Sequence, residues 1–228
     1  MSKDSIPSAS LVLREPPKPS RGQQRSDEIV RIASALFLEN GYDQTSVDEI
    51  IHRAGGSKTH VYRKFGGKEG LFLASVKYLC DEIQLSIGNL DVSGLSVEAG
   101  LQTLSLALMR ILLSDGHLAF QRLVYAEASR FPEVGKIWFE RGPKASGRIF
   151  SQFIRKRMQQ GHLRSADPEL AASLLCDMLS GHLLDQTWLG IAARPSPAKI
   201  KQASNTAVQI FLHGYSHGNV PIKQPKSR

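Results

Sequence analysis

The sequence contains little cysteine: Cys80 and Cys176 are the only two among 228 residues. They lie far apart, each within an apolar segment, so they form neither a C-x-x-C zinc motif nor a readable disulfide framework. His213 and His217 have a spacing that could place two ligands on one helix face, but no carboxylate or cysteine lies near them. We therefore expect no metal site, no cofactor and a reducing compartment.

No hydrophobic run is long enough to span a bilayer, because the most apolar stretch, 104–113, is short and contains Arg110. Residues 1–20 lack the apolar segment of a signal peptide. The alternating pattern of β-strands is also missing, and helical spacing dominates from Ser26 onward. These absences predict an all-α protein that stays in the cytoplasm and has no membrane partner.

Acidic residues are outnumbered by basic ones, 21 against 29, which gives a net charge of +8. This balance favours a polyanionic partner, such as nucleic acid or an anionic membrane surface, although solubility alone could also explain it. The sequence shows no nucleophile–base–orienter set and no glycine-rich loop that would cradle a phosphate. We therefore do not expect an enzyme.

Capping and turn residues predict a helix-turn-helix over residues 46–65. Ser46 and Glu49 form an S-x-x-E capping box, which starts one helix. Gly55-Gly56 then breaks the chain, and Ser57 caps a short helix that ends at Phe65. Two short helices joined by a glycine turn have the geometry that places the second helix in a DNA groove. An earlier helix, from Ser26 onward, is expected to end at Asn40-Gly41.

The short helix that Ser57 caps and that ends at Phe65 carries cations and hydrogen-bonding groups but no acid. An ordinary solvated helix face mixes charges of both signs. Cations neutralise phosphates and a helix fits the major groove. Lys68 begins the next helix, where the macrodipole disfavours a cation by about 0.3–1 kcal/mol unless an anion such as a phosphate binds there. The residues expected to contact DNA are Thr45, Ser46, Ser57, Lys58, Thr59, His60, Tyr62, Arg63, Lys64 and Lys68.

The stretch from Thr45 to Phe72 resembles the DNA-binding signature of the TetR/AcrR family of transcriptional regulators, without a gap. The resemblance covers residues 22–82, and the later segments 122–133 and 161–172 resemble an AefR-like C-terminal subtype. It implies a homodimeric repressor that binds a partly palindromic operator and is released by a small molecule. Two positions depart from the family pattern. His60 replaces a threonine that contacts phosphate, and Gly56 replaces a valine whose burial is worth about 1.5–3 kcal/mol, which should loosen the helix packing.

Four segments are expected along the chain. Residues 1–21 form a disordered basic arm, although the same cations could touch phosphates or a minor groove. Residues 22–82 form the DNA-binding domain, and residues 83–218 form a helical domain for dimerisation and effector binding. Residues 219–228 form a polar tail.

The helices expected at 168–190 and 197–215 carry more apolar residues than one stripe needs, which predicts a self-complementary interface between two copies. Ser173, Ser180 and Gly181 would let a partner helix approach closely. The residues expected in this interface are Leu170, Leu174, Leu175, Leu179, Leu183 and Phe211.

Further helices expected at 97–113, 117–130 and 133–160, the last bent near Gly142-Pro143, could enclose an effector pocket. The alternative is a solid core. The residues expected to line the pocket are Leu104, Leu108, Phe120, Gln121, Val124, Trp138, Phe150, Asp177, Met178 and His182. The expected effector is uncharged or weakly acidic and partly aromatic. Two rival functions remain: a DNA-binding architectural protein without an effector, and a helical enzyme or lipid carrier with a basic surface.

Overall fold

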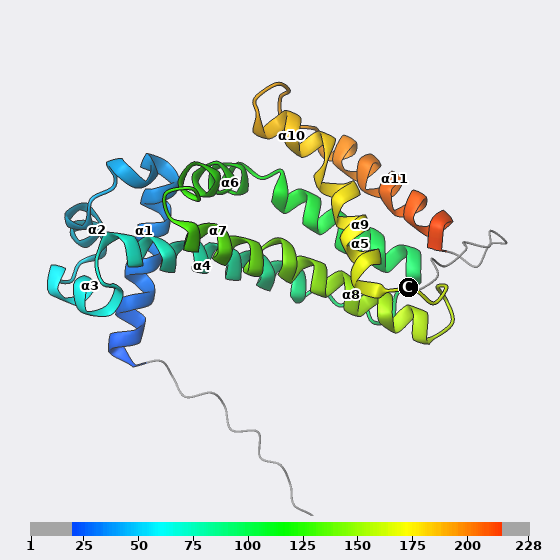
Figure 1. The fold of residues 1–228 in the computed structure, drawn as a ribbon, viewed down its shortest axis with the longest axis horizontal. Helices are drawn as coiled ribbons and strands as arrows, with labels where there is room; N and C mark the ends of the chain where they lie inside the picture. The colour runs from blue at the N-terminus through cyan, green and yellow to red at the C-terminus, as the bar shows by residue number, and fades with distance from the viewer. Residues whose placement is uncertain (1–19, 216–228) are drawn as a thin grey trace, which may run out of the picture.

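The computed structural model describes residues 20–215, which fold into helices with no strand among them. The helices are α1 (Arg21–Gln44), α2 (Val47–Ala54), α3 (Lys58–Phe65), α4 (Lys68–Gly88), α5 (Val97–Leu112), α6 (Asp115–Glu127), α7 (Pro132–Arg141), α8 (Pro143–Gln159), α9 (Pro168–Ser180), α10 (His182–Trp188) and α11 (Pro197–Tyr215). Figure 1 shows an elongated molecule with α1, α2 and α3 at one end and α9, α10 and α11 towards the other. The long helix α4 and the consecutive α7 and α8 run between the two ends.

The predicted helix starts are confirmed by side-chain caps. Oγ of Ser46 accepts from the backbone N–H of Glu49 at 3.1 Å, and Oγ of Ser57 accepts from that of His60 at 3.2 Å. The carboxylate of Asp167 accepts from two N–H groups in the first turn of α9. Each cap satisfies amides that the first turn of a helix leaves without a partner.

The first helix begins earlier than predicted, at Arg21 and not at Ser26. Oγ of Ser20 accepts from the N–H of Gln23 at 3.2 Å and so caps the helix start. The end of the expected arm is therefore helical. Residues 1–19 lie outside the described part of the chain, so the expected disorder there stays a prediction.

The expected helix over 168–190 is broken at Gly181, whose backbone (φ −73°, ψ −127°) is not helical, and this break separates α9 from α10. Gly41 interrupts the end of α1 with a φ of 78°, at the expected position. Among residues 20–215 no single helix is long and apolar enough to cross a membrane, although α5 and α6 together pass that test with a bend of 66° between them.

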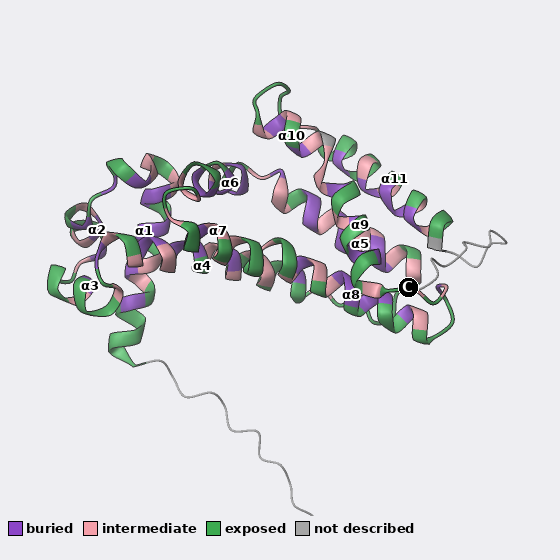
Figure 2. Ribbon diagram, viewed as in Figure 1, coloured by how far each residue is buried: buried purple, intermediate pink, exposed green. Residues whose placement is uncertain are grey.

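Buried side chains form two hydrophobic clusters, and Figure 2 shows buried residues at both ends of the molecule. The first cluster joins α1–α4 to α6 and α7, and the second joins α5, α8, α9 and α11. Helix α6 borders both, because Phe120 and Val124 belong to the first cluster and Leu118 to the second. Helix α4 does the same through Val76 and Ile87. The end that carries α3 therefore shares its packing with the rest of the chain through α4 and α6.

Arg157 on α8 is only 6% exposed and holds the loop between α4 and α5. Its guanidinium donates to the carbonyl oxygens of Val92 at 3.4 Å, Ser93 at 3.2 Å and Leu95 at 2.6 Å. It also lies 4.8 Å from the centre of the Phe153 ring. A single buried cation thus satisfies three carbonyls of a loop that has no helix of its own.

The change Arg157→Met is expected to lower the free energy of unfolding by about 2–4 kcal/mol, because three carbonyls lose a charged donor. Chemical denaturation of both proteins measures the difference. Arg148→Met is the control, since Arg148 is exposed and, within the described part of the chain, donates only to the carbonyl of Glu140 at 3.4 Å. Equal stability of Arg157→Met and the unchanged protein would show that the loop does not depend on this contact.

Candidate nucleic-acid interface

Helix α3 presents a cationic surface at one end of the molecule. Val61 is 0% exposed and anchors the helix on the first cluster. The opposite side is open, and Figure 2 shows α3 as largely exposed. The exposed side chains are Lys58, Thr59, Tyr62, Arg63 and Lys64. The structure thus leaves uncovered most of the face that was predicted to contact DNA.

His60 is the exception on this helix, because its side chain turns towards α1. Nε2 of His60 lies 3.1 Å from Oγ of Ser26, and that hydroxyl donates to the carbonyl of Gly22 at 2.9 Å. Since the hydroxyl hydrogen is already used, the imidazole is the donor in this pair. His60 therefore ties α3 to the start of α1, and its expected direct contact with DNA stays a prediction.

Arg25 covers the glycine turn between α2 and α3. A Cβ placed on Gly55 would lie 2.5 Å from its guanidinium, and one on Gly56 would lie 3.4 Å from it. Gly56 also has a φ of 122°, which a valine rarely adopts. Arg25 lies beside the position that a valine side chain would take, and the expected loosening at Gly56 stays a prediction. Arg25 was not among the residues expected to contact DNA, because the first helix was expected from Ser26 onward and a start at Arg21 is needed to place Arg25 beside the turn.

Two expected contacts have partners within the chain. Nζ of Lys58 lies 2.9 Å from the carboxylate of Asp48, which raises the pKa of the Lys58 ammonium. Nζ of Lys68 donates to the carbonyl of Asp43 at 3.1 Å and lies 4.4 Å from the centre of the Tyr42 ring. Lys68 thus has a structural reason to begin α4, and its position no longer requires a bound phosphate.

Thr45 does not fit its expected role, because it is only 1% exposed. Its hydroxyl donates to the carbonyls of Leu36 at 3.2 Å and Gly41 at 2.8 Å, so it closes the end of α1 and does not reach a partner. Ser46 and Ser57 are exposed, but both hydroxyls accept from the first turns of their helices. They lie at the helix N-termini, where backbone amides favour a phosphate.

The end of the molecule that carries α3 is joined to the turn between α6 and α7. Arg130 pairs with Asp43 at 2.7 Å, and its guanidinium lies 5.2 Å from the centre of the Tyr42 ring. The rings of Tyr42 and Phe131 have centres 4.7 Å apart, and Phe72 lies 5.0 Å from Tyr42. A movement of α6 would therefore reach the loop that precedes α2.

The residues expected to line an effector pocket do not meet in one interior. Leu104, Leu108 and Phe150 belong to the second cluster, and Phe120 and Val124 belong to the first. Asp177 and Met178 are exposed on α9. Gln121 is buried and Trp138 is half-buried, while the side chain of His182 lies outside what the structure describes. The expectation was incomplete because apolar residues of these helices serve two separate clusters.

The residues expected in a dimer interface fall into two groups. Leu175, Leu179 and Phe211 are at most 3% exposed inside the chain's own second cluster, so they are not available to a partner. Leu183 is half-buried against the same cluster. Leu170 and Leu174 are 55% and 46% exposed, and together with Met178 they form one stripe on α9. Only the exposed stripe of Leu170, Leu174 and Met178 supports an interface.

Two short helices, a glycine turn between them and a basic exposed second helix define a helix-turn-helix DNA-binding protein. Two family models match the chain: bacterial regulatory proteins of the TetR family over residues 29–75, and the C-terminal domain of AefR-like transcriptional repressors over residues 99–217. The chain belongs to the TetR family of bacterial transcriptional regulators. Members of this family are regulators and not enzymes, and they act on DNA operators as dimers.

Solved structures share the fold along nearly the whole chain. A TetR-family regulator from Mesorhizobium loti is 31% identical, with a TM-score of 0.81, over 87% of this chain and 100% of that one. The flavonoid-responsive regulator FrrA is 27% identical, with a TM-score of 0.73, over 85% of this chain and 98% of that one. QacR of Staphylococcus aureus is 43% identical over 47 residues, which are 21% of this chain and only 25% of QacR.

Proposed function

We propose that the chain is a homodimeric repressor that binds a partly palindromic operator and releases it when a small molecule binds behind the DNA-binding end. The observation that carries this proposal is the exposed, acid-free face of α3, seated on Val61 and extended by Arg25 from α1. Side chains at the start of such a helix reach base edges, and flanking cations reach phosphates. The match to AefR-like repressors supports repression.

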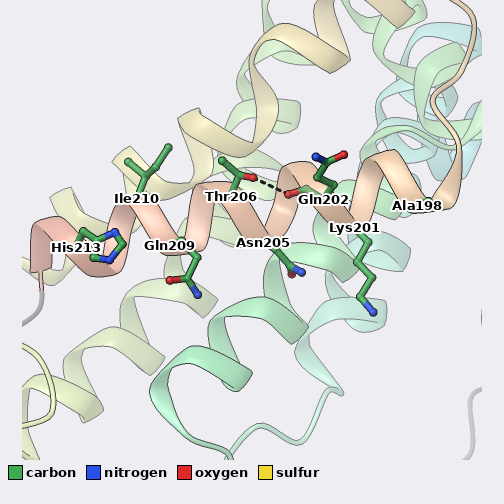
Figure 3. Close-up of a pocket in the computed structure, with 8 residues that line it drawn as sticks. All are labelled: Ala198, Lys201, Gln202, Asn205, Thr206, Gln209, Ile210 and His213. Atoms are coloured by element: carbon green, nitrogen blue, oxygen red, sulfur yellow. Dashed lines mark hydrogen bonds between the residues drawn. The ribbon is translucent and has the colours of Figure 1, made fainter.

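Helix α11 supports an interface between two copies. Figure 3 shows mainly polar side chains along it, from Ala198 to His213, which line an open surface hollow of about 620 Å³. A groove of about 450 Å³ between α9 and α11 includes Met178 and Ile210, which are 42% and 58% exposed. Packing α9 and α11 against their copies around a two-fold axis would cover these apolar side chains. The same axis would place two copies of α3 on one face of a duplex.

An uncharged or weakly acidic, partly aromatic compound is the effector that we propose. FrrA, which shares the fold, is described as flavonoid-responsive. Such a compound must bind the DNA-incompetent shape better than the competent one, typically by about 1–3 kcal/mol. Helix α6 can couple binding of the compound to the position of α3, because Phe120 and Val124 pack in the cluster that holds α1 and α3.

Selection of bound sequences from a pool of random duplexes tests this proposal. Two copies of α3 related by a two-fold axis should enrich an inverted repeat whose half-sites lie about one helical turn apart. An architectural protein, the nearest rival, would enrich no consensus. The variant His60→Thr should return an altered consensus if His60 helps to position α3 for base contacts. An unchanged consensus would restrict His60 to holding α1.

Arg25→Ala is expected to weaken binding to all duplexes alike and to lower the slope of log affinity against log salt by about one unit, the loss of one phosphate contact. Titrations at several salt concentrations measure that slope. Arg31→Ala is the matched control, because Arg31 lies on another side of α1 and pairs with Glu28 at 2.7 Å. An unchanged slope for Arg25→Ala would limit Arg25 to supporting the glycine turn.

A further inference from the structure

Buried polar atoms without partners lie on one stripe of α6. The side chains of His117 and Gln121 are 8% and 7% exposed. Among the side chains that the structure describes, which do not include that of His182, both ring nitrogens of His117 and Oε1 of Gln121 have no hydrogen-bond partner. Native structures rarely leave such atoms unpaired, because each loses the hydrogen bonds that water would give. Two such residues, one helical turn apart, indicate that something else supplies the partners.

Aromatic rings flank this stripe. Tyr125, one turn beyond Gln121, has its ring centre 5.1 Å from that of Trp188 on α10 and 5.3 Å from that of Trp138 on α7. Both pairs meet edge to face. Nε1 of Trp188 is a further buried donor without a partner among the described residues. The unpaired polar atoms therefore lie on the side of α6 where three aromatic rings gather.

The available groups define the chemistry of a ligand. Burial lowers the pKa of His117 to about 4, so its imidazole is neutral at physiological pH and offers one donor and one acceptor. Gln121 offers an acceptor and Trp188 a donor. None of these groups is charged, so a charged ligand would be buried without a counter-ion. A neutral compound with aromatic rings and a hydroxyl group matches both the polar atoms and the flanking rings.

We propose that His117, Gln121 and Trp188 form the polar end of a binding site for a neutral, hydroxylated aromatic compound between α6 and α10. This inference rests on the proposed function, because it locates the effector and states which group the effector must carry. The backbone carbonyl of Trp188 accepts from Arg122 at 3.0 Å, which holds α10 against α6. Phe120 and Val124 lie on the same buried face of α6 as His117 and Gln121, and the ring centre of Phe120 is 6.2 Å from that of His117. Both belong to the first cluster, so a ligand that displaces this face of α6 acts on α1 and α3.

The first test needs no ligand. If Oε1 of Gln121 is unpaired in the free protein, Gln121→Leu removes a buried polar group of similar size without losing a contact. The melting temperature of this variant should rise by about 2–4 °C. A fall in melting temperature would show that Gln121 has a structural partner, and that result would overturn the proposal.

The second test uses two probes, 7-hydroxyflavone and flavone, which differ by one hydroxyl group. Calorimetry should show that 7-hydroxyflavone binds about tenfold more tightly, the worth of one hydrogen bond to a buried group. Gln121→Leu and His117→Leu should abolish this preference. Ser204→Ala should keep it, because Ser204 on α11 is also a buried hydroxyl without a partner among the described residues and lies away from α6. Equal binding of the two probes, no binding of either, or a preference that survives both α6 variants would overturn the site.

Operator release, measured in the same samples, separates this inference from the proposed function. If 7-hydroxyflavone releases the operator from the unchanged protein but not from Gln121→Leu, the result supports both the binding site and ligand-responsive repression. Binding with the expected preference but without release supports the site and contradicts ligand-responsive repression. Release that persists in both α6 variants supports repression and contradicts the site.

Discussion

Leu174→Glu is expected to leave the chain folded but monomeric, and to lower its affinity for a palindromic operator by about 100-fold or more, because one α3 then binds without its tethered partner. Leu174 is 46% exposed in the single chain and lies between Leu170 and Met178 on the stripe of α9. A glutamate there stays hydrated in the monomer. In the proposed dimer its carboxylate would be buried without a partner, which is costly.

Analytical ultracentrifugation and operator titrations measure the two effects together. Leu85→Glu is the matched control, because Leu85 is 56% exposed on α4 and lies outside the proposed interface. That variant should remain dimeric with unchanged affinity. A Leu174→Glu protein that sediments as a dimer and binds normally would place the interface on another face.

A variant with Lys58, Tyr62 and Lys64 all changed to alanine is expected to lose at least about 100-fold in operator affinity while it keeps its melting temperature. Hydrogen bonds to charged groups are worth about 1.5–3 kcal/mol each, and this variant loses two cations and a phenol from α3. All three side chains are exposed in the free chain, so the fold does not depend on their packing. Lys58 must leave Asp48 to bind DNA, so its single change should cost less than that of Lys64.

Fluorescence anisotropy with labelled operator measures this loss. Lys136→Ala is the charge control, because Lys136 is exposed on α7 and lies outside the helix-turn-helix. If the triple variant bound as tightly as the unchanged protein, another basic surface would carry the DNA contact.

The helix-turn-helix could be predicted because its signals are local. Ser46, Ser57 and Asp167 cap the residues that follow them, and each cap is formed as the sequence indicates. Gly55 and Gly66 end their helices with φ values of 68° and 79° that favour glycine. Such interactions span only a few residues, so the order of residue types is enough to identify them.

Contacts between distant segments could not be predicted in the same way. The pairing of His60 with Ser26 and the position of Arg25 over Gly55 depend on how α1 packs against α3. Neither contact was expected, because Ser20 was not identified as a cap and the first helix was therefore predicted to begin later than it does. Likewise, the dipole argument for Lys68 could not include its bond to the carbonyl of Asp43.

The C-terminal residue sets were partly misassigned because an excess of apolar residues does not say which partner covers them. Leu175 and Phe211 are used within the chain's own cluster, whereas Leu170 and Leu174 remain exposed. The ring nitrogens of His117, which have no partner among the described residues, likewise become apparent only once the burial of α6 is known. Apolar spacing identifies a helix face, and three-dimensional packing decides whether that face is covered.

The most direct test of DNA recognition is a titration of the selected operator and of a scrambled duplex of equal composition, at physiological salt. The predicted result is two protomers per operator and a preference for the operator of at least about 1,000-fold, as expected of specific DNA binding. Equal affinity for the two duplexes would contradict a site-specific regulator and would favour the architectural protein.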